Sequence, residues 1–283
     1  MKIAILGTGS IGSTFAFQLA RHAHQVTVIA RGKRLEQLQA EQAIVTVSGE
    51  REAVTVSAAL DPAIDFDLVL VVVLDSQVEA VLPALKASAA KTVMFMFNTL
   101  QPFSVLREAV GPQRFAFGFP AINASLTEGK LKFQAFSGPA SSIASDAVWA
   151  KVFSAAGLPT VVHNDIQAWV HTHVALMVPL MSLSSLVYTR QAGVSWAEAR
   201  TYALALREGF ALVQQLGDSV TPSGLVILKR APKSMVAALF WALSRLKLIR
   251  DIGALGPLEP RALIDRMLVA APEHTSALRA IRP

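Results

Sequence analysis

The chain contains no cysteine, and its 283 residues include only two tyrosines and six histidines. Without cysteine the protein can form no disulfide, no cysteine-ligated zinc site and no thiol nucleophile. No apolar run reaches the roughly 20 residues that a membrane-spanning helix needs, because the longest candidate, after His173, is interrupted by Pro179 and several serines. The chain begins directly on a strand-like run, so no signal peptide is expected. These features predict no membrane span and are compatible with a cytoplasmic location.

Charged residues are also scarce, at 16% of the chain, whereas hydrophobic residues make up 53%. The formal net charge is +6; residues 1–164 hold 13 basic and 12 acidic residues, and residues 165–283 hold 13 and 8. The surplus is not gathered into a dense basic block or a nucleic-acid-binding motif. We therefore expect a small anionic substrate and no nucleic acid. The hydrophobic content is sufficient for a large core and for a homodimer interface.

Strand-like and helix-like segments alternate through the first half of the chain. Short β-rich runs occupy Lys2–Leu6 and Gln25–Ile29, and apolar residues recur with helical spacing over Ile11–His22. Continuous apolar runs over Asp67–Leu74 and Thr92–Phe97 are typical of strands that are buried on both faces. This alternation predicts an α/β domain of the Rossmann type with a parallel sheet.

Further strands are expected at Phe115–Phe119 and Lys130–Phe136, joined by a glycine-containing turn. From Asp165 onward the spacing of apolar residues is helical almost throughout. We therefore predict a Rossmann-type domain over residues 1–164, followed by an all-α domain over residues 165–283.

The segment GTGSIG forms a G-x-G-x-x-G motif directly between the first strand and the first helix. The pattern alone is weak evidence, but this position is the one in which it binds a dinucleotide. Gly7 permits a tight turn, Gly9 lets the backbone approach a pyrophosphate, and Gly12 lets the helix pack closely on the strand. Free N–H groups at the helix N-terminus then face the phosphates. The predicted phosphate-binding residues are Gly7, Thr8, Gly9, Ser10, Ile11 and Gly12.

The second predicted strand is followed by cations instead of an acid. An NAD site usually has an acidic residue here, which binds the ribose 2′-hydroxyl. This chain has Arg31, Lys33 and Arg34 at that point and no acid. Arg31 can bind a 2′-phosphate through two parallel hydrogen bonds, and the other two cations can add charge. The sequence therefore favours NADP over NAD.

At these residues the sequence resembles the ketopantoate reductase (2-dehydropantoate 2-reductase) family. The similarity is carried by MKIAILGTGSIG, VTVIAR, Val73–Gln77, Phe97–Thr99 and Gly138-Pro139, and it is more diffuse in the helical half. The resemblance implies an NADP-binding Rossmann domain joined to an all-helical domain. It also implies reduction of the 2-keto group of ketopantoate in a cleft between the two domains.

The resemblance assigns roles to individual residues of the first half. Gly7, Gly9, Gly12, Arg31 and Gln77 stand at cofactor positions. Asn98 matches an Asn that lies next to nicotinamide and substrate in the family, so it is both a cofactor-binding and a catalytic candidate. Two positions depart from the family pattern, since Thr99 replaces a Gly and Leu74 replaces a Lys that contacts cofactor and substrate.

The second half departs further from the family. An ungapped alignment places His173 at the Lys that protonates the carbonyl oxygen, and Met177 at an Asn one turn later. Glu259 is the nearest match to the Glu that holds the hydroxyl end of the substrate, and Asp265 is a second candidate. The resemblance thus implies a catalytic group of His173, Asn98 and Glu259.

The stretch IQAWVHTHVALM raises a separate question about its two histidines. On a helix, residues two apart point about 200° away from each other, so His171 and His173 cannot share a metal ion and no metal site is expected. A protonated His173 can take over the role of the family Lys, which predicts faster turnover as the pH falls through the imidazole pKa. The alternative is a packed core histidine with no catalytic role.

Three functions remain open from the sequence. We favour an NADPH-dependent reductase of a small 2-keto acid. The second is a non-catalytic NADP-binding sensor or degenerate relative, which is favoured by the replacement of both family lysines, at Leu74 and His173. The third is a two-domain dehydrogenase with an imine or another carbonyl acceptor.

Overall fold

The computed structural model describes residues 1–138 and 141–283, which form two compact units. The first unit comprises residues 1–97 and 102–166, and the second comprises residues 98–101 and 167–283. The boundary predicted after Asn164 lies two residues before this division. The sequence did not predict that the short segment Asn98–Gln101 would lie with the helical unit. Of the family-like dipeptide Gly138-Pro139, the proline falls outside the described residues.

The first unit is built on an eight-stranded sheet with the order β12-β11-β8-β7-β6-β1-β2-β5. All neighbouring strands pair in parallel except β8 and β11, which are antiparallel. The predicted Rossmann-type sheet is therefore confirmed. Its strands are β1 (Lys2–Leu6), β2 (Gln25–Ile29), β5 (Thr55–Ser57), β6 (Leu68–Val71), β7 (Val93–Phe95), β8 (Phe115–Phe119), β11 (Ser142–Ala144) and β12 (Thr160–Val162).

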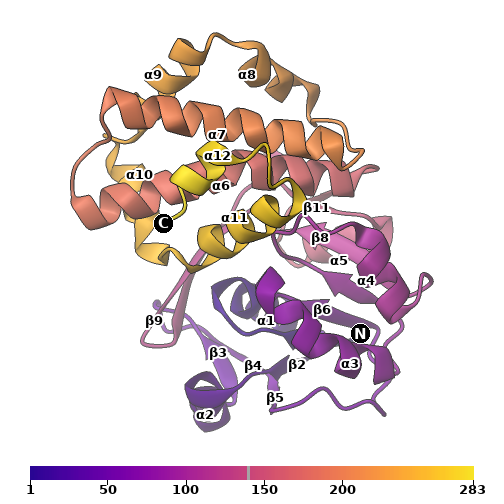
Figure 1. Ribbon diagram of the computed structural model, residues 1–283. Coiled ribbons are helices and arrows are strands. Elements are labelled where there is room, and N and C mark those ends of the chain that lie inside the picture. The colour runs from indigo at the N-terminus through magenta and orange to yellow at the C-terminus, as the bar shows by residue number, and fades with distance from the viewer. Residues whose placement is uncertain (139–140) are drawn as a thin grey trace. The chain divides into compact units, whose positions relative to one another are not determined.

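Helices cover this sheet and bury its central strands (Figure 1). The two strands at its centre, β7 and β6, are apolar and buried, as their continuous apolar runs predict. Phe15 of the first helix packs edge-on against Phe153 of the fifth, with ring centroids 5.1 Å apart. The helices of the unit are α1 (Ser10–Arg21), α2 (Gly32–Glu41), α3 (Val78–Ala87), α4 (Phe103–Val110) and α5 (Ala147–Ala155), with a short 3₁₀ helix η1 (Asp75–Gln77).

One predicted connection in the first unit is wrong. The turn at Glu128 and Gly129 does not join β8 to the next strand; it joins β9 (Ile122–Thr127) to β10 (Lys130–Ala135) in a separate antiparallel hairpin. The strand β9 escaped notice because its residues alternate between the core side and solvent, so it carries no continuous apolar run. A second small antiparallel sheet pairs β3 (Ala43–Val45) with β4 (Arg51–Ala53).

The second unit is all-α in its described residues, as predicted. Its two longest helices, α6 (Ile166–Arg190) and α7 (Trp196–Gln215), form its core. A capping box at Ser195 and Glu198 begins α7. The shorter helices are α8 (Val226–Arg230), α9 (Lys233–Leu243), α10 (Lys247–Ile252), α11 (Leu258–Ala270) and α12 (Ser276–Ala280), with 3₁₀ turns η3 (Ser223–Leu225) and η4 (Gly253–Leu255).

The helix α6 continues through Pro179, which interrupts the apolar run of the sequence but not the helix. Proline lacks the N–H that would bond to the carbonyl of Ala175, four residues earlier. Gly209 of α7 packs against that carbonyl, where a side chain would lie only 3.2 Å from the oxygen. The glycine therefore lets α7 approach closely the carbonyl to which the proline cannot donate.

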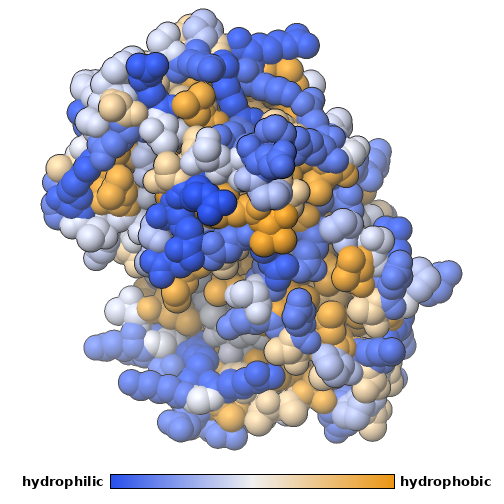
Figure 2. Space-filling view, in the orientation of Figure 1, coloured by the Kyte–Doolittle hydropathy of each residue, from blue (hydrophilic) through white to orange (hydrophobic). Residues whose placement is uncertain are grey.

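Among the described residues, α6 is the one helix long and apolar enough to cross a membrane. However, 67% of its most apolar window is buried inside the protein, as is usual for a core helix. The visible face of the second unit mixes hydrophilic and hydrophobic side chains (Figure 2).

Candidate functional site

The glycine loop between β1 and α1 has the geometry that the motif predicts. Gly7 has a φ of +102°, and a Cβ there would lie 2.2 Å from the carbonyl oxygen of Val72, just after β6. A Cβ on Gly12 would lie 1.9 Å from the oxygen of Gly7. Both positions therefore exclude any side chain. Gly9 differs, because a Cβ there would meet nothing within 4 Å, which leaves open space directly over the backbone.

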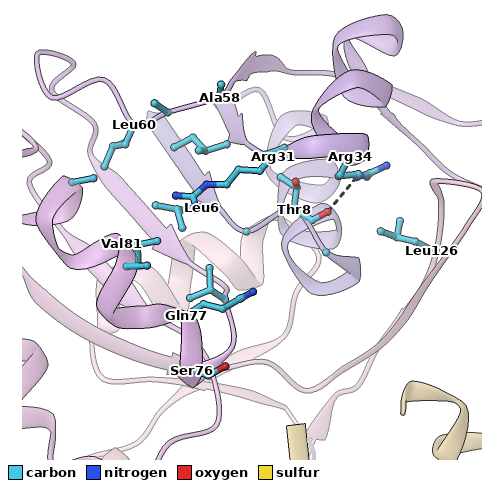
Figure 3. Close-up of a pocket in the computed structure, with 18 residues that line it drawn as sticks. Leu6, Thr8, Arg31, Arg34, Ala58, Leu60, Ser76, Gln77, Val81 and Leu126 are labelled. Atoms are coloured by element: carbon cyan, nitrogen blue, oxygen red, sulfur yellow. Dashed lines mark hydrogen bonds between the residues drawn. The ribbon is translucent and has the colours of Figure 1, made fainter. Parts of the chain in front are cut away.

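A cavity of about 660 Å³ lies beside this loop, entirely within the first unit (Figure 3). It sits at the carboxyl ends of β1 and β6, where the strand order reverses and α/β sheets bind their ligands. Ala58–Leu60 and the Val81 side of α3 form an apolar wall. No acidic residue is among the lining residues, so the cavity favours an anionic ligand. Of the predicted cofactor residues, those in the lining are Gly7, Thr8, Gly9, Arg31 and Gln77.

The other predicted cofactor residues lie elsewhere. Ser10, Ile11 and Gly12 form the first turn of α1 and do not line the cavity. Gly12 acts through its contact with the loop backbone, as described above. Asn98 belongs to the second unit. Five of the nine predicted cofactor residues thus line one cavity, and four are not in its lining.

The two arginines after β2 have different surroundings. The guanidinium of Arg34 donates to the carbonyl oxygens of Thr8 and Gly129, at 3.2 and 3.0 Å, and to Ser13 Oγ at 2.9 Å. Burial lowers the pKa of Arg34. Its donors hold the glycine loop to the hairpin, and its side chain also lines the cavity. Arg31 is exposed at the N-terminus of α2 and lines the cavity.

Gln77 shapes the turn that follows β6. Its side-chain oxygen accepts a hydrogen bond from the backbone N–H of Leu74 over 3.1 Å and so closes the η1 turn. Leu74, which stands where the resembling family has a Lys, is 38% exposed.

A group of polar residues in the second unit contains two of the predicted catalytic residues. Asn98 Nδ2 donates to Glu259 Oε1 over 2.8 Å. Glu259 lies in the first turn of α11. Asn98 Oδ1 is buried and has no hydrogen-bond partner in the described structure. Because the carboxylate fixes the NH₂ side of the amide, the oxygen is left as an acceptor for a donor group of a ligand.

The third predicted catalytic residue, His173, differs from the expectation. Its ring stacks on that of Trp169, one turn earlier on α6, with centroids 4.9 Å apart and 10° between the planes. Burial lowers the pKa of His173 to about 4. The ring is therefore neutral near pH 7, whereas the catalytic hypothesis assumed an ordinary histidine that is readily protonated.

Sequence reasoning missed His171, its neighbour on α6. This ring is fully buried, with Nδ1 2.6 Å from Asp218 Oδ2 and Nε2 3.2 Å from the carbonyl oxygen of Gln101. The alignment pointed to His173, and no sequence motif links His171 to Asp218, 47 residues away.

Two further positions that the resemblance singled out, Asp265 and Met177, offer no free polar group for a substrate. Asp265 forms an ion pair with Arg282 at 2.6 Å, which lowers the pKa of the carboxyl group. Met177 offers no hydrogen-bond donor at the position of the family Asn. Within the described ranges, no three His, Cys, Asp or Glu side chains gather in a way that could hold a metal ion.

Comparison with known proteins identifies the relatives of the first half. Residues 3–141 match the model of the ketopantoate reductase PanE/ApbA family. A 2-dehydropantoate 2-reductase of Vibrio cholerae serotype O1 is 32% identical over 135 residues, which cover 47% of this chain and 41% of that protein. The matched segment thus spans less than half of the curated relative.

Solved structures resemble the whole chain in fold. A PanE/ApbA family ketopantoate reductase from Ralstonia eutropha JMP134 has a TM-score of 0.75 at 21% identity, covering 100% of this chain and 96% of that one. A D-mandelate dehydrogenase, solved with NADH and anilino(oxo)acetate, has a TM-score of 0.72 at 14% identity, covering 100% and 96%. At these identities the likeness establishes the shared fold.

Proposed function

We propose that the chain, whose first half matches the ketopantoate reductase family, is a divergent member of it and an NADPH-dependent reductase of a small 2-keto acid. The observation that carries the proposal is the cavity beside the glycine loop, which is lined by Arg31 and by no acid. A dinucleotide with a 2′-phosphate suits these residues, because a guanidinium binds phosphate through two parallel hydrogen bonds.

The residues present fit a bound nicotinamide dinucleotide. The open space over Gly9 leaves room for a pyrophosphate at the N-terminus of α1, where free N–H groups face it. The apolar wall at Ala58–Leu60 and Val81 suits an adenine ring. Arg31 would hold the 2′-phosphate, and Gln77 would contribute an amide near the turn after β6. When bound, the reduced cofactor supplies the hydride that reaches the carbonyl carbon.

The polar residues of the second unit would bind and orient the substrate. Asn98, with its NH₂ group fixed by Glu259, offers Oδ1 to a hydroxyl of the substrate. The carbonyl oxygen must gain a proton as the hydride arrives. A neutral imidazole can still donate a hydrogen bond to a developing oxyanion, so His173 remains our candidate for stabilising that oxygen, which would then take its proton from water.

A second candidate function is a non-catalytic NADP-binding sensor. It is favoured by Leu74 at the position of a family Lys and by the lowered pKa of His173. A third is a dehydrogenase that uses another acceptor or NADH, as the D-mandelate dehydrogenase neighbour was solved with NADH. A cytoplasmic location and a homodimer stay predictions.

The test combines cofactor binding with turnover. The full chain is titrated with NADPH and NADH, and the oxidation of each is then followed with a panel of 2-keto acids and with imines. Tight NADPH binding and turnover of a 2-keto acid are expected. Binding without turnover on any member would replace the proposal with the sensor, and turnover of imines alone would replace it with the third function. Failure to bind either dinucleotide would overturn all three.

A further inference from the structure

The segment Asn98–Gln101 is held at both ends by helices of the second unit. At its start, Asn98 bonds to Glu259 of α11. At its end, the side chain of Gln101 meets the guanidinium of Arg266, also on α11. With the amide oriented so that its oxygen faces this group, the oxygen accepts hydrogen bonds from Arg266. The carbonyl oxygen of Gln101 lies 3.2 Å from Nε2 of His171 on α6. The flanking residues on either side belong to the first unit, so the helical unit determines where this short segment lies.

Both ring nitrogens of His171 face acceptors. Nδ1 faces the carboxylate of Asp218 at 2.6 Å, and Nε2 faces the carbonyl of Gln101. An imidazole can donate from both nitrogens only when it carries two protons. Asp218 provides the countercharge, and its other oxygen accepts from Gln167 Nε2 at 3.0 Å. The side chains of His171 and Asp218 are 0% and 10% exposed.

A buried ion pair of this kind contributes little net stability compared with a well-packed apolar pair, but it fixes the direction of its hydrogen bonds. Here the fixed direction is that of Nε2–H toward Gln101. The Gln101 carbonyl is three residues from Asn98, in a segment tightened further by a hydrogen bond from the Gln101 N–H to Thr99 Oγ1 at 3.0 Å. A displacement of the carbonyl is therefore passed to the side chain of Asn98.

We propose that His171, held by Asp218, is a positioning residue: through the Gln101 carbonyl it keeps the Asn98 amide in place for the substrate. The inference rests on the proposed function, in which Asn98 contacts substrate. His171 is not among the residues that line the cofactor cavity, and the proposal gives it no direct contact with the substrate. A catalytic group misplaced by about 1 Å can lose about a hundredfold in rate, so the effect of losing this bond is measurable.

Two substitutions at the same position separate positioning from packing. In His171→Gln, the side-chain nitrogen takes the place of Nε2 and still donates to Gln101. In His171→Asn, the nitrogen takes the place of Nδ1, keeps the bond to Asp218 and cannot reach Gln101. Both variants are neutral and lose the ring. We expect kcat/KM for the keto acid to fall about tenfold to a hundredfold in His171→Asn and by less than about threefold in His171→Gln, with NADPH affinity unchanged in both.

A third variant leaves the histidine intact. Asp218→Ala removes the carboxylate that holds the ring at Nδ1, so Nε2 is no longer held toward the Gln101 carbonyl. It should reproduce the kinetic loss of His171→Asn. It also serves as the test if substitutions at His171 prevent folding.

A double-mutant cycle identifies the route of the effect. If His171 acts through Asn98, adding His171→Asn to Asn98→Ala should cause little further loss, because the group that it positions is already gone. Fully additive losses, or equal losses in His171→Asn and His171→Gln, would overturn the proposal.

A readout without turnover separates this inference from the proposed function. The side-chain NH₂ resonances of Asn98, assigned by comparison with Asn98→Ala, report its contact with Glu259. They should shift or broaden in His171→Asn and remain near their wild-type positions in His171→Gln. If the protein reduces no keto acid but these shifts occur, the positioning role stands while the proposed function fails. Unchanged resonances in His171→Asn would refute the positioning role even in an active enzyme.

Discussion

Asn98 donates a hydrogen bond to Glu259 over 2.8 Å, although the two residues are 161 positions apart in the chain. The bond fixes which side of the Asn98 amide faces away from the carboxylate, and this side is the buried oxygen that lacks a partner in the described structure. A substrate hydroxyl is the group that would complete this arrangement.

The first prediction concerns Glu259. In Glu259→Ala the NH₂ group of Asn98 loses its acceptor, and a hydrogen bond to a charged group is worth about 1.5–3 kcal/mol. We expect kcat/KM to fall about tenfold to a hundredfold, whereas Glu259→Gln, which keeps an accepting oxygen, should lose less. Asp265→Asn is the matched control. Asp265 lies on the same helix as Glu259, but its carboxylate pairs with Arg282. A loss in the control equal to that in Glu259→Ala would contradict the assigned role.

The second prediction concerns activity and pH. Since burial lowers the pKa of His173 to about 4, its ring stays neutral from pH 8 down to about pH 5. The rate should therefore not rise through an ordinary histidine pKa near 6.5 as the pH falls. The measurement is the pH profile of kcat/KM in wild type and in His173→Gln. A rise near pH 6.5 that His173→Gln abolishes would restore the imidazolium hypothesis.

The third prediction follows from the same pKa and concerns stability. The folded-state pKa of His173 lies below its unfolded value, so the unfolded chain binds the proton more readily. The part of the free energy of unfolding that depends on the neutral ring is fully present above about pH 6.5 and is lost as the pH falls toward 4. The shift corresponds to a loss of up to about 3 kcal/mol in the free energy of unfolding. Urea unfolding at several pH values should show this slope, and His173→Gln should flatten it; an unchanged slope in the variant would show that other groups cause it.

Much of the fold follows from the sequence, because its strongest signals are local. The continuous apolar runs of β6 and β7 predicted the centre of the sheet, and the glycine motif predicted the loop beside which the cavity lies. The strand β9 and the weakly patterned β3 and β4 were missed, since short half-buried strands carry little periodic signal.

The site was only partly predictable. Residues of one loop, such as Gly7 and Gly9, are brought together by local sequence. The link between His171 and Asp218 depends on how α6 packs with the loop after α7, and no periodicity reports it. The fall in the pKa of His173 likewise arises from burial in the folded chain, which a histidine in a helical pattern does not reveal.

The fourth prediction distinguishes two glycines of the same loop. Gly12→Ala places a methyl group 1.9 Å from the Gly7 oxygen, so the loop must shift and the free energy of unfolding should fall. Gly9→Ala meets no atom within 4 Å, so its thermal stability should stay near wild type. If the pyrophosphate approaches this backbone, Gly9→Ala should nevertheless weaken NADPH binding by about tenfold or more. Wild-type NADPH affinity in Gly9→Ala would place the dinucleotide elsewhere.

The fifth prediction concerns the choice between NADPH and NADH. Both Arg31 and Arg34 line the cavity, but Arg34 also donates hydrogen bonds to Thr8, Ser13 and Gly129. A charge-assisted hydrogen bond to a phosphate is worth about 1.5–3 kcal/mol. Arg31→Ala should therefore weaken NADPH binding about tenfold to a hundredfold and leave NADH binding unchanged. Lys33→Ala, an exposed cation two residues away, is the control and should alter the NADPH/NADH ratio of Kd values by less than about threefold. An unchanged NADPH/NADH ratio of Kd values in Arg31→Ala would mean that this guanidinium does not bind the 2′-phosphate. Reduced stability in Arg34→Ala, measured in parallel, would show that the neighbouring arginine supports the loop.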